Sequence, residues 1–265
     1  MKYQLETIPV WEAYEKEGEC PVCILEEKTE KHYVDFFLGN SVMVPEIRVQ
    51  VNQSGFCPHH FALLFSGGNK LGLALMTHTH LTELNKRLEK QLGKLLKAAR
   101  TLSSDGLVKG IRGGQSLSRS LRESSRDYSD HNCRCMICER LSNTLKRYAF
   151  TIVYLWQKES DFRETLQKSK GFCLPHFYFV NEMAAEVLSG RQLAAWIGDV
   201  VPLEQGNLRR LETQVHHFTQ KFDYRSDGIP WKDARDALPR ALQKLTGKFP
   251  RDEQYGLTDR KGPKR

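Results

Sequence analysis

Two sets of cysteine and histidine residues, repeated with the same spacing, are the part of this sequence that could do chemistry. Each set opens with a Cys-x-x-Cys pair and closes with a Gly-Phe-Cys-x-x-His-Phe string. In both sets, 34 or 35 positions separate the second thiol of the pair from the third. Such a match predicts that one structural unit has been duplicated. The candidate ligands are Cys20, Cys23, Cys57 and His60 in the first copy, and Cys135, Cys138, Cys173 and His176 in the second.

Three thiols and one imidazole are a full ligand set for a tetrahedral structural zinc ion. We therefore expect two zinc ions, each bound by the four residues of one copy. In the first copy His60 is the expected ligand rather than His59, because the second copy has Pro175 at the position of His59. Cys133 has no counterpart in the first copy, so we interpret it as a spare thiol that could substitute as a ligand.

Other chemistry is compatible with the same residues. A Cys-x-x-Cys pair can form a redox-active dithiol, and cysteine-rich sets also hold iron–sulfur clusters. A catalytic zinc is disfavoured, since four protein ligands leave no position for a substrate water. The sequence has no glycine-rich phosphate loop and no nucleophile elbow. Enzymatic activity therefore stays an open question, and a protein without catalytic activity is the favoured interpretation.

The elements that must position these residues are helices. Leucines spaced by three and four run from Leu81 to Leu95, and a similar apolar stripe runs from Leu208 to Phe222. Each pattern predicts a long amphipathic helix. A further helix is expected from Phe61 to Leu75. No stretch alternates with the period of a β-strand. The predicted fold is all-α, with two pseudo-repeated helical halves. Each half is expected to be cross-linked by one Cys3His metal site, and the long amphipathic helices of the two halves are expected to pack together.

The composition suggests how the chain is divided. We expect a first metal-binding half at residues 1–100, a flexible linker rich in Ser, Gly and Arg at 101–130, a second half at 131–247 and a disordered tail at 248–265. No stretch is long and apolar enough to span a membrane, and the first residues lack a secretory signal. A cytoplasmic location is therefore expected, where thiols stay reduced.

A basic segment at residues 86–126 raises the question of an anionic partner. Its Lys and Arg residues outnumber its Asp and Glu residues, and the whole chain has a formal charge of +8. Such a segment could follow a phosphate backbone, although charge of this kind is often only the solvated face of a helix. No strip of alternating aromatic and basic residues accompanies it. Nucleic-acid binding therefore stays an alternative.

The blocks around the thiols resemble an uncharacterised bacterial family found mainly among Firmicutes. The resemblance rests on the segment from Leu5 to Trp11, the first Cys-x-x-Cys block, both Gly-Phe-Cys strings and the segment from Phe222 to Arg225. It implies a duplicated thiol–histidine design in a bacterial cytoplasmic protein, and it implies no activity.

The leading interpretation is a non-enzymatic, zinc-stabilised helical module or adaptor that binds another protein. A redox-responsive zinc–thiolate switch and a nucleic-acid-binding protein are the alternatives.

Overall fold

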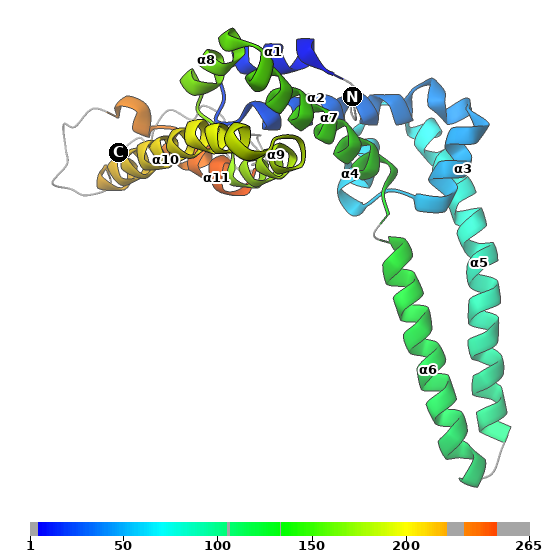
Figure 1. Cartoon of the computed structure of the whole chain (residues 1–265). Helices are drawn as coiled ribbons and strands as arrows, with labels where there is room; N and C mark the ends of the chain where they lie inside the picture. Colours follow the sequence, from blue (N-terminus) through cyan, green and yellow to red (C-terminus); the bar gives the residue numbers. More distant parts are fainter. Residues whose placement is uncertain (1–4, 105–106, 133, 222–230, 248–265) are drawn as a thin grey trace. The chain divides into compact units, whose positions relative to one another are not determined.

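The protein is an assembly of α-helices, as the computed structural model shows (Figure 1). The structure describes residues 5–104, 107–132, 134–221 and 231–247. No strand occurs within these ranges, so the predicted all-α class is confirmed. No helix among the described residues is both long and apolar enough to cross a bilayer.

Eleven α-helices and two short 3-10 helices make up the described chain. In chain order they are α1 (Thr7–Glu15), α2 (Pro21–Leu38), η1 (Asn40–Met43), α3 (Pro45–Ser54), α4 (Pro58–Ser66), α5 (Lys70–Ser104), α6 (Leu107–Asn132), α7 (Met136–Lys158), α8 (Ser160–Lys168), α9 (Leu174–Val187), α10 (Gly190–Gln220), η3 (Lys232–Ala234) and α11 (Ala237–Thr246). The two longest, α5 and α10, contain the apolar stripes predicted from the sequence, the second as far as Phe218, while Phe222 lies outside the described residues.

One expected helix is divided in two. Residues 61–75 were predicted to be a single helix, but α4 ends at Ser66 and α5 begins at Lys70. The glycines at 67 and 68 lie between the two helices. The Asn69 side chain caps the next helix by accepting a hydrogen bond from the Gly72 N–H, at 2.8 Å. A cap of this kind satisfies a backbone donor at the start of a helix, so it favours a new start at this point.

The chain forms two compact units that differ from the predicted halves. Unit 1 combines Met1–Lys28 with Asn143–Arg265, and unit 2 is the intervening segment Thr29–Ser142. Both boundaries fall within helices, α2 and α7. The boundaries proposed at residues 100 and 131 are therefore not boundaries between these units.

The predicted linker is also corrected by the structure. Most of residues 101–130 is helical, because it comprises the end of α5 and nearly all of α6. Its apolar residues, such as Leu117 and Leu121, recur at helical spacing and supply a face that packs against α5. The predicted tail at 248–265 lies outside the described residues.

The core of unit 1 is formed by α1, the start of α2, and α7 to α10. Trp156 and Trp196 meet edge to face at 5.2 Å, and Phe162 lies fully buried against Trp11 and Tyr14. Aromatic pairs of this geometry stabilise a core beyond the area that they bury. They fix α7, α8 and α10 around the N-terminal segment that contains the first thiol pair.

A buried ion pair connects α10 and α11 to the turn before α9. The Lys244 ammonium lies 3.0 Å from the Glu204 carboxylate, and both side chains are almost inaccessible to solvent. Lys244 also donates a hydrogen bond to the carbonyl of Lys170, and Glu204 accepts one from the backbone N–H of Phe172. Because a buried charge is costly unless it is paired, these contacts fix the backbone next to Cys173.

The core of unit 2 is smaller and lies beside the second thiol pair. Phe37, Phe56, Leu64, Met76 and Ile137 are its central members. Within this unit α5 packs against α3 and α6. In unit 1, α10 packs against α11, α8 and α9. Each long helix therefore has neighbours within its own unit, and the packing of one long helix on the other stays a prediction.

Candidate metal centres

All eight ligand residues named from the sequence come together in two Cys3His quartets, but the pairing differs from the expected one. Each quartet takes its Cys-x-x-Cys pair from one sequence copy and its Cys-x-x-His turn from the other. Site I consists of Cys20, Cys23, Cys173 and His176, and site II consists of Cys57, His60, Cys135 and Cys138. The assignment of one ion to each copy was therefore wrong.

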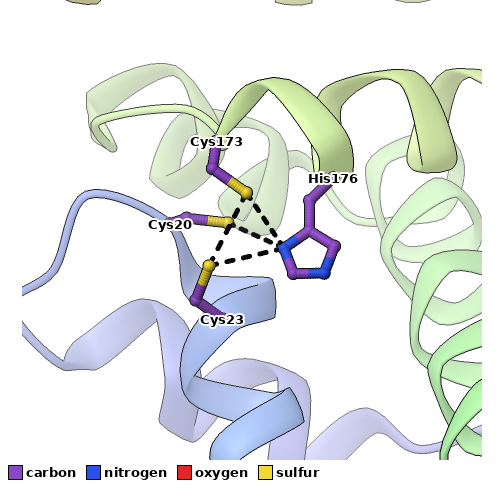
Figure 2. A group of neighbouring side chains, drawn as sticks. All are labelled: Cys20, Cys23, Cys173 and His176. Carbon is purple, nitrogen blue, oxygen red and sulfur yellow. Dashed lines mark hydrogen bonds between the residues drawn. The ribbon is translucent and has the colours of Figure 1, made fainter. Parts of the chain in front are cut away.

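Site I is a compact and fully buried group in unit 1 (Figure 2). The Nδ1 atom of His176 lies 3.1 Å from the sulfur of Cys173, 3.4 Å from that of Cys23 and 3.5 Å from that of Cys20. The sulfurs of Cys23 and Cys173 are 3.6 Å apart. All four donor atoms thus face one point.

Site II repeats this geometry in unit 2. The Nδ1 atom of His60 lies 3.1 Å from the sulfur of Cys57 and 3.3 Å from the sulfurs of Cys135 and Cys138. The sulfurs of Cys57 and Cys138 are 3.8 Å apart. The site differs from site I in exposure, because Cys138 is exposed and Cys57 is half-buried, whereas all four residues of site I are buried.

These spacings suit a single tetrahedral ion. With metal–sulfur bonds of about 2.3 Å and metal–nitrogen bonds of about 2.0 Å, an ideal tetrahedron places two sulfurs about 3.8 Å apart and a sulfur about 3.5 Å from the nitrogen. The observed separations lie close to both values. A disulfide needs its sulfurs about 2.05 Å apart, and the six cysteines of the two sites are free thiols. Each quartet can therefore hold one ion.

The ligands sit at the N-termini of four helices. Cys20 directly precedes α2, and Cys135 directly precedes α7, so the second thiol of each pair falls in the first helical turn. Cys57 and Cys173 are the N-cap residues of α4 and α9, and each has proline within the first two helical positions that follow. A helix N-terminus carries a partial positive charge that stabilises thiolates. Two such termini converge on each site.

A glycine with positive φ precedes each Cys-x-x-His turn and sets the direction in which the backbone enters it. Gly55 has φ of 65° and Gly171 has φ of 71°, values that favour glycine over other residues. The following phenylalanine, Phe56 or Phe172, is then buried in the core of its unit. At Gly55 the carbonyl accepts a hydrogen bond from the N–H of Met136, at 3.2 Å. This bond places the start of α7, with its thiol pair, against the turn that contributes Cys57.

A carboxylate lies behind each imidazole, and the sequence analysis missed both. Glu30 Oε1 is 3.2 Å from Nε2 of His60, and Glu26 Oε2 is 3.7 Å from Nε2 of His176. Metal-binding histidines commonly donate the second ring N–H to a carboxylate, which orients the ring and strengthens the ligand. Glu30 is within reach of such a bond, whereas Glu26 lies beyond hydrogen-bond distance and can act on His176 only through its charge. The available signal was the spacing: Glu26 and Glu30 are one helical turn apart on α2, just after the thiol pair.

Protonation in the metal-free chain follows from these contacts. Burial disfavours the charged form of His60, but hydrogen bonds with Cys135 and Glu30 outweigh it and raise the pKa of the imidazole to about 10. The same balance, with Cys173 and Cys20 as partners, raises the pKa of His176 to about 10. Burial opposes ionisation of Cys135, yet its hydrogen bond with His60 lowers the pKa of this thiol to about 6. Metal binding would displace these protons.

Other candidate residues lie outside the two quartets. His59 is exposed, as expected, and its Nε2 lies 3.1 Å from the Glu30 carboxylate. His80, a residue without an assigned role in the sequence analysis, donates a hydrogen bond to the carbonyl of Asn52 and covers Gly55. Cys133 lies outside the described residues, so its role as a spare thiol stays a prediction.

Comparison with known proteins places the chain in a family. Residues 1–252 match the family of unknown function DUF6062, and the chain therefore belongs to it. It is similar to an uncharacterised 23.9 kDa protein encoded 3' of xynA in Caldicellulosiruptor sp. (strain Rt8B.4), with 21% identity over 222 residues that cover 81% of this chain and 91% of that protein. No solved structure matches significantly. The predicted resemblance to an uncharacterised bacterial family is thereby confirmed.

Proposed function

We propose that the protein binds two zinc ions as structural cross-links and acts as a non-enzymatic module that presents a helical surface to another protein. The observation that carries the metal part is the convergence of three sulfurs and one Nδ1 atom in each quartet, with all donors within 4.8 Å of one another. Four protein ligands complete a tetrahedron, so neither ion would keep a position for substrate. This arrangement supports a structural role.

Zinc is favoured over an iron–sulfur cluster by the donor spacing. In a cluster the four ligands are divided among two or four iron atoms, so the cluster itself holds at least some of the donor atoms far apart. Here all four donor atoms of each quartet lie within 4.8 Å of one another, as expected around one ion. The mixed set of thiolates and imidazole is also a common structural zinc set.

Elemental analysis of freshly purified, tag-free protein tests the metal assignment. We expect about two zinc ions per chain, because each quartet supplies a complete tetrahedral set. Removing the zinc with a chelator under reducing conditions should lower the thermal stability, since binding at a structural site is coupled to folding. Folded protein that contains no zinc, or that contains iron and sulfide, would overturn the assignment.

Site II also supports a second candidate function, a redox-responsive switch. The observation in its favour is the exposure of Cys138, whose sulfur is 3.8 Å from that of Cys57. Hydrogen peroxide would oxidise these two thiolates to a disulfide and accept two electrons and two protons to give two molecules of water. The zinc ion would leave as its ligands are lost. Site I has no comparably exposed sulfur.

The switch is tested by timed zinc release. With about one equivalent of peroxide per chain and a colorimetric zinc chelator, wild-type protein should release about one zinc per chain promptly, because only site II is accessible, and reductant with added zinc should restore the zinc content. A Cys138→Ser variant should lose the fast phase, while a Cys23→Ser variant should keep it. Equal release rates from the two sites would rule out this second function.

A further inference from the structure

Helices α5 and α6, here called the hairpin, run antiparallel and side by side within unit 2 (Figure 1). An apolar groove lies along this pair. The groove has a volume of about 520 Å³. It is lined almost wholly by leucine and small residues: Leu92, Gly93, Leu95, Leu96, Ala99, Leu117 and Leu121. The side chains of Leu92, Leu96 and Leu121 are each at least half exposed. Contiguous apolar surface of this kind marks an interaction site.

The geometry of the groove suits a third helix. Leu92 and Leu95 also line a larger, adjoining hollow of about 1080 Å³, and Leu88, four positions before Leu92 on α5, continues the leucine row into that hollow. Two helices alone can bury only the inner side of such a leucine row, and Leu95 remains half-buried while Leu92 is 55% exposed. A helix that lays leucines at positions i, i+3, i+4 and i+7 into the groove would cover the row.

The border of the groove is basic. Lys86, Arg87, Lys90 and Lys94 on α5, together with Arg134, line the adjoining hollow. Glu83, which lines the same hollow, pairs with Lys86 at 2.8 Å, and Glu123 pairs with Arg119 at 3.3 Å. The net positive charge of the hollow therefore rests on Arg87, Lys90, Lys94 and Arg134. The positive charge therefore favours a partner with acidic residues on either side of its apolar stripe.

We infer that the hairpin groove binds an acidic amphipathic helix of another protein. This inference rests on the proposed function as an interaction module, and it specifies the surface and the chemistry of the partner. A second copy of this chain is a poorer occupant, because it would bring its own basic rows against these. A nucleic acid would use the cations and leave the leucine row uncovered.

The probe is a synthetic, fluorescein-labelled helical peptide of about 21 residues, about 30 Å long as a helix. It carries leucines at i, i+3, i+4 and i+7 and glutamates on both sides of them. A matched peptide has lysine in place of every glutamate. We expect the glutamate peptide to raise its anisotropy on titration with the zinc-loaded full chain, and the affinity to fall with salt. The lysine peptide should bind at least about tenfold more weakly.

Variants test the two parts of the groove separately. Replacing both Leu92 and Leu96 by Gln should weaken binding of the glutamate peptide by about tenfold or more, because it removes the apolar anchors. Leu71→Gln is the matched control, since Leu71 is 72% exposed on the same helix and does not line the groove. Lys90→Glu with Lys94→Glu should also weaken binding, whereas Lys146→Glu with Lys158→Glu, on α7, should not.

Zinc content and circular dichroism of every variant separate this inference from the proposed metal function. Wild-type zinc content with no peptide binding would overturn the inference and leave the metal sites standing. Equal binding of both peptides would overturn it, as would leucine variants that bind like wild type. A leucine-dependent dimer in sedimentation experiments would identify a second copy as the occupant. An oligonucleotide that binds independently of Leu92 and Leu96 would identify nucleic acid.

Discussion

The sulfurs of Cys23 and Cys173 lie 3.6 Å apart although 150 residues separate them in the chain. The thiol pair at the N-terminus of α2 thus meets the histidine turn of the other copy. Site II shows the reciprocal exchange, with Cys57 beside Cys138 across 81 residues. The two sites are nested, because the segment that holds site II lies between the two segments that hold site I.

This pairing predicts a distinctive pattern of zinc content. A double variant, Cys23→Ser with Cys173→Ser, should retain about one zinc per chain, because both changes fall in site I. The matched double variant, Cys23→Ser with Cys57→Ser, should lose nearly all zinc, since it damages both sites. Ligands paired within each sequence copy would give the reverse order. Elemental analysis of the two purified proteins decides between the two pairings.

The carboxylate behind His60 should contribute to metal affinity. Glu30→Gln keeps the size of the side chain but removes the charge 3.2 Å from Nε2, and we expect zinc affinity at site II to fall by about 10- to 100-fold. Competition with a chelator of known affinity measures this. Glu27→Gln is the matched control and should leave the affinity unchanged, because Glu27 is exposed on the same helix and belongs to neither quartet. An unaltered affinity in Glu30→Gln would show that the carboxylate has no role in binding.

The glycine before the buried site should not tolerate a side chain. Gly171 has a positive φ, and a Cβ atom there would lie 2.6 Å from a carboxylate oxygen of Glu204. Gly171→Ala should therefore lower the free energy of unfolding by about 1–3 kcal/mol. Gly198→Ala is the control, because Gly198 lies within α10 with open space around it, and alanine there should stabilise the helix by up to about 1 kcal/mol. Urea unfolding monitored by circular dichroism measures both; equal effects would contradict the assigned strain.

The carboxylate of Asp199 should make part of the stability depend on acid pH. Burial opposes its ionisation, but hydrogen bonds from Arg163 and Trp156 outweigh this and lower its pKa from the ordinary value of 3.8. The folded state then binds the proton less readily than the unfolded chain. The stabilisation is fully present above the unfolded pKa and is lost as pH falls through the lower, folded value.

Asp199→Asn tests this dependence. The difference in unfolding free energy between wild type and variant should be largest above about pH 5 and should shrink below about pH 4. Urea titrations followed by tryptophan fluorescence can measure it, because Trp156 donates directly to this carboxylate. A difference that stays constant down to pH 2 would contradict the assignment.

The sequence was sufficient to identify the eight residues that gather in the two quartets, because residue type and spacing alone define a Cys-x-x-Cys pair and a Cys-x-x-His turn. It could not define their pairing. Both copies offer the same two half-sites at the same spacing, so exchanging the partners leaves every local pattern unchanged. Only long-range contacts, such as the hydrogen bond from Met136 to Gly55, distinguish the two arrangements.

The helical class followed from the leucine spacing of α5 and α10, while the segment at 101–130 was misread for a physical reason. Its Ser and Gly residues have low helix propensity, and tertiary packing on α5 overrides that preference through Leu117 and Leu121. The spacing of Glu26 and Glu30 places both on one face of α2, but it does not assign either carboxylate to an imidazole, because that role depends on where His60 and His176 lie in space.

The nested order of the two sites has a consequence for synthesis on the ribosome. The N-terminal thiols at Cys20 and Cys23 emerge early but must wait for His176 before their coordination shell can close. The inner quartet is complete as soon as Cys138 has left the exit tunnel. If the quartets bind metal as proposed, loading should proceed from the inside outward, and a nascent chain from which Cys138 but not Cys173 has emerged would carry one closed centre and one unprotected dithiol.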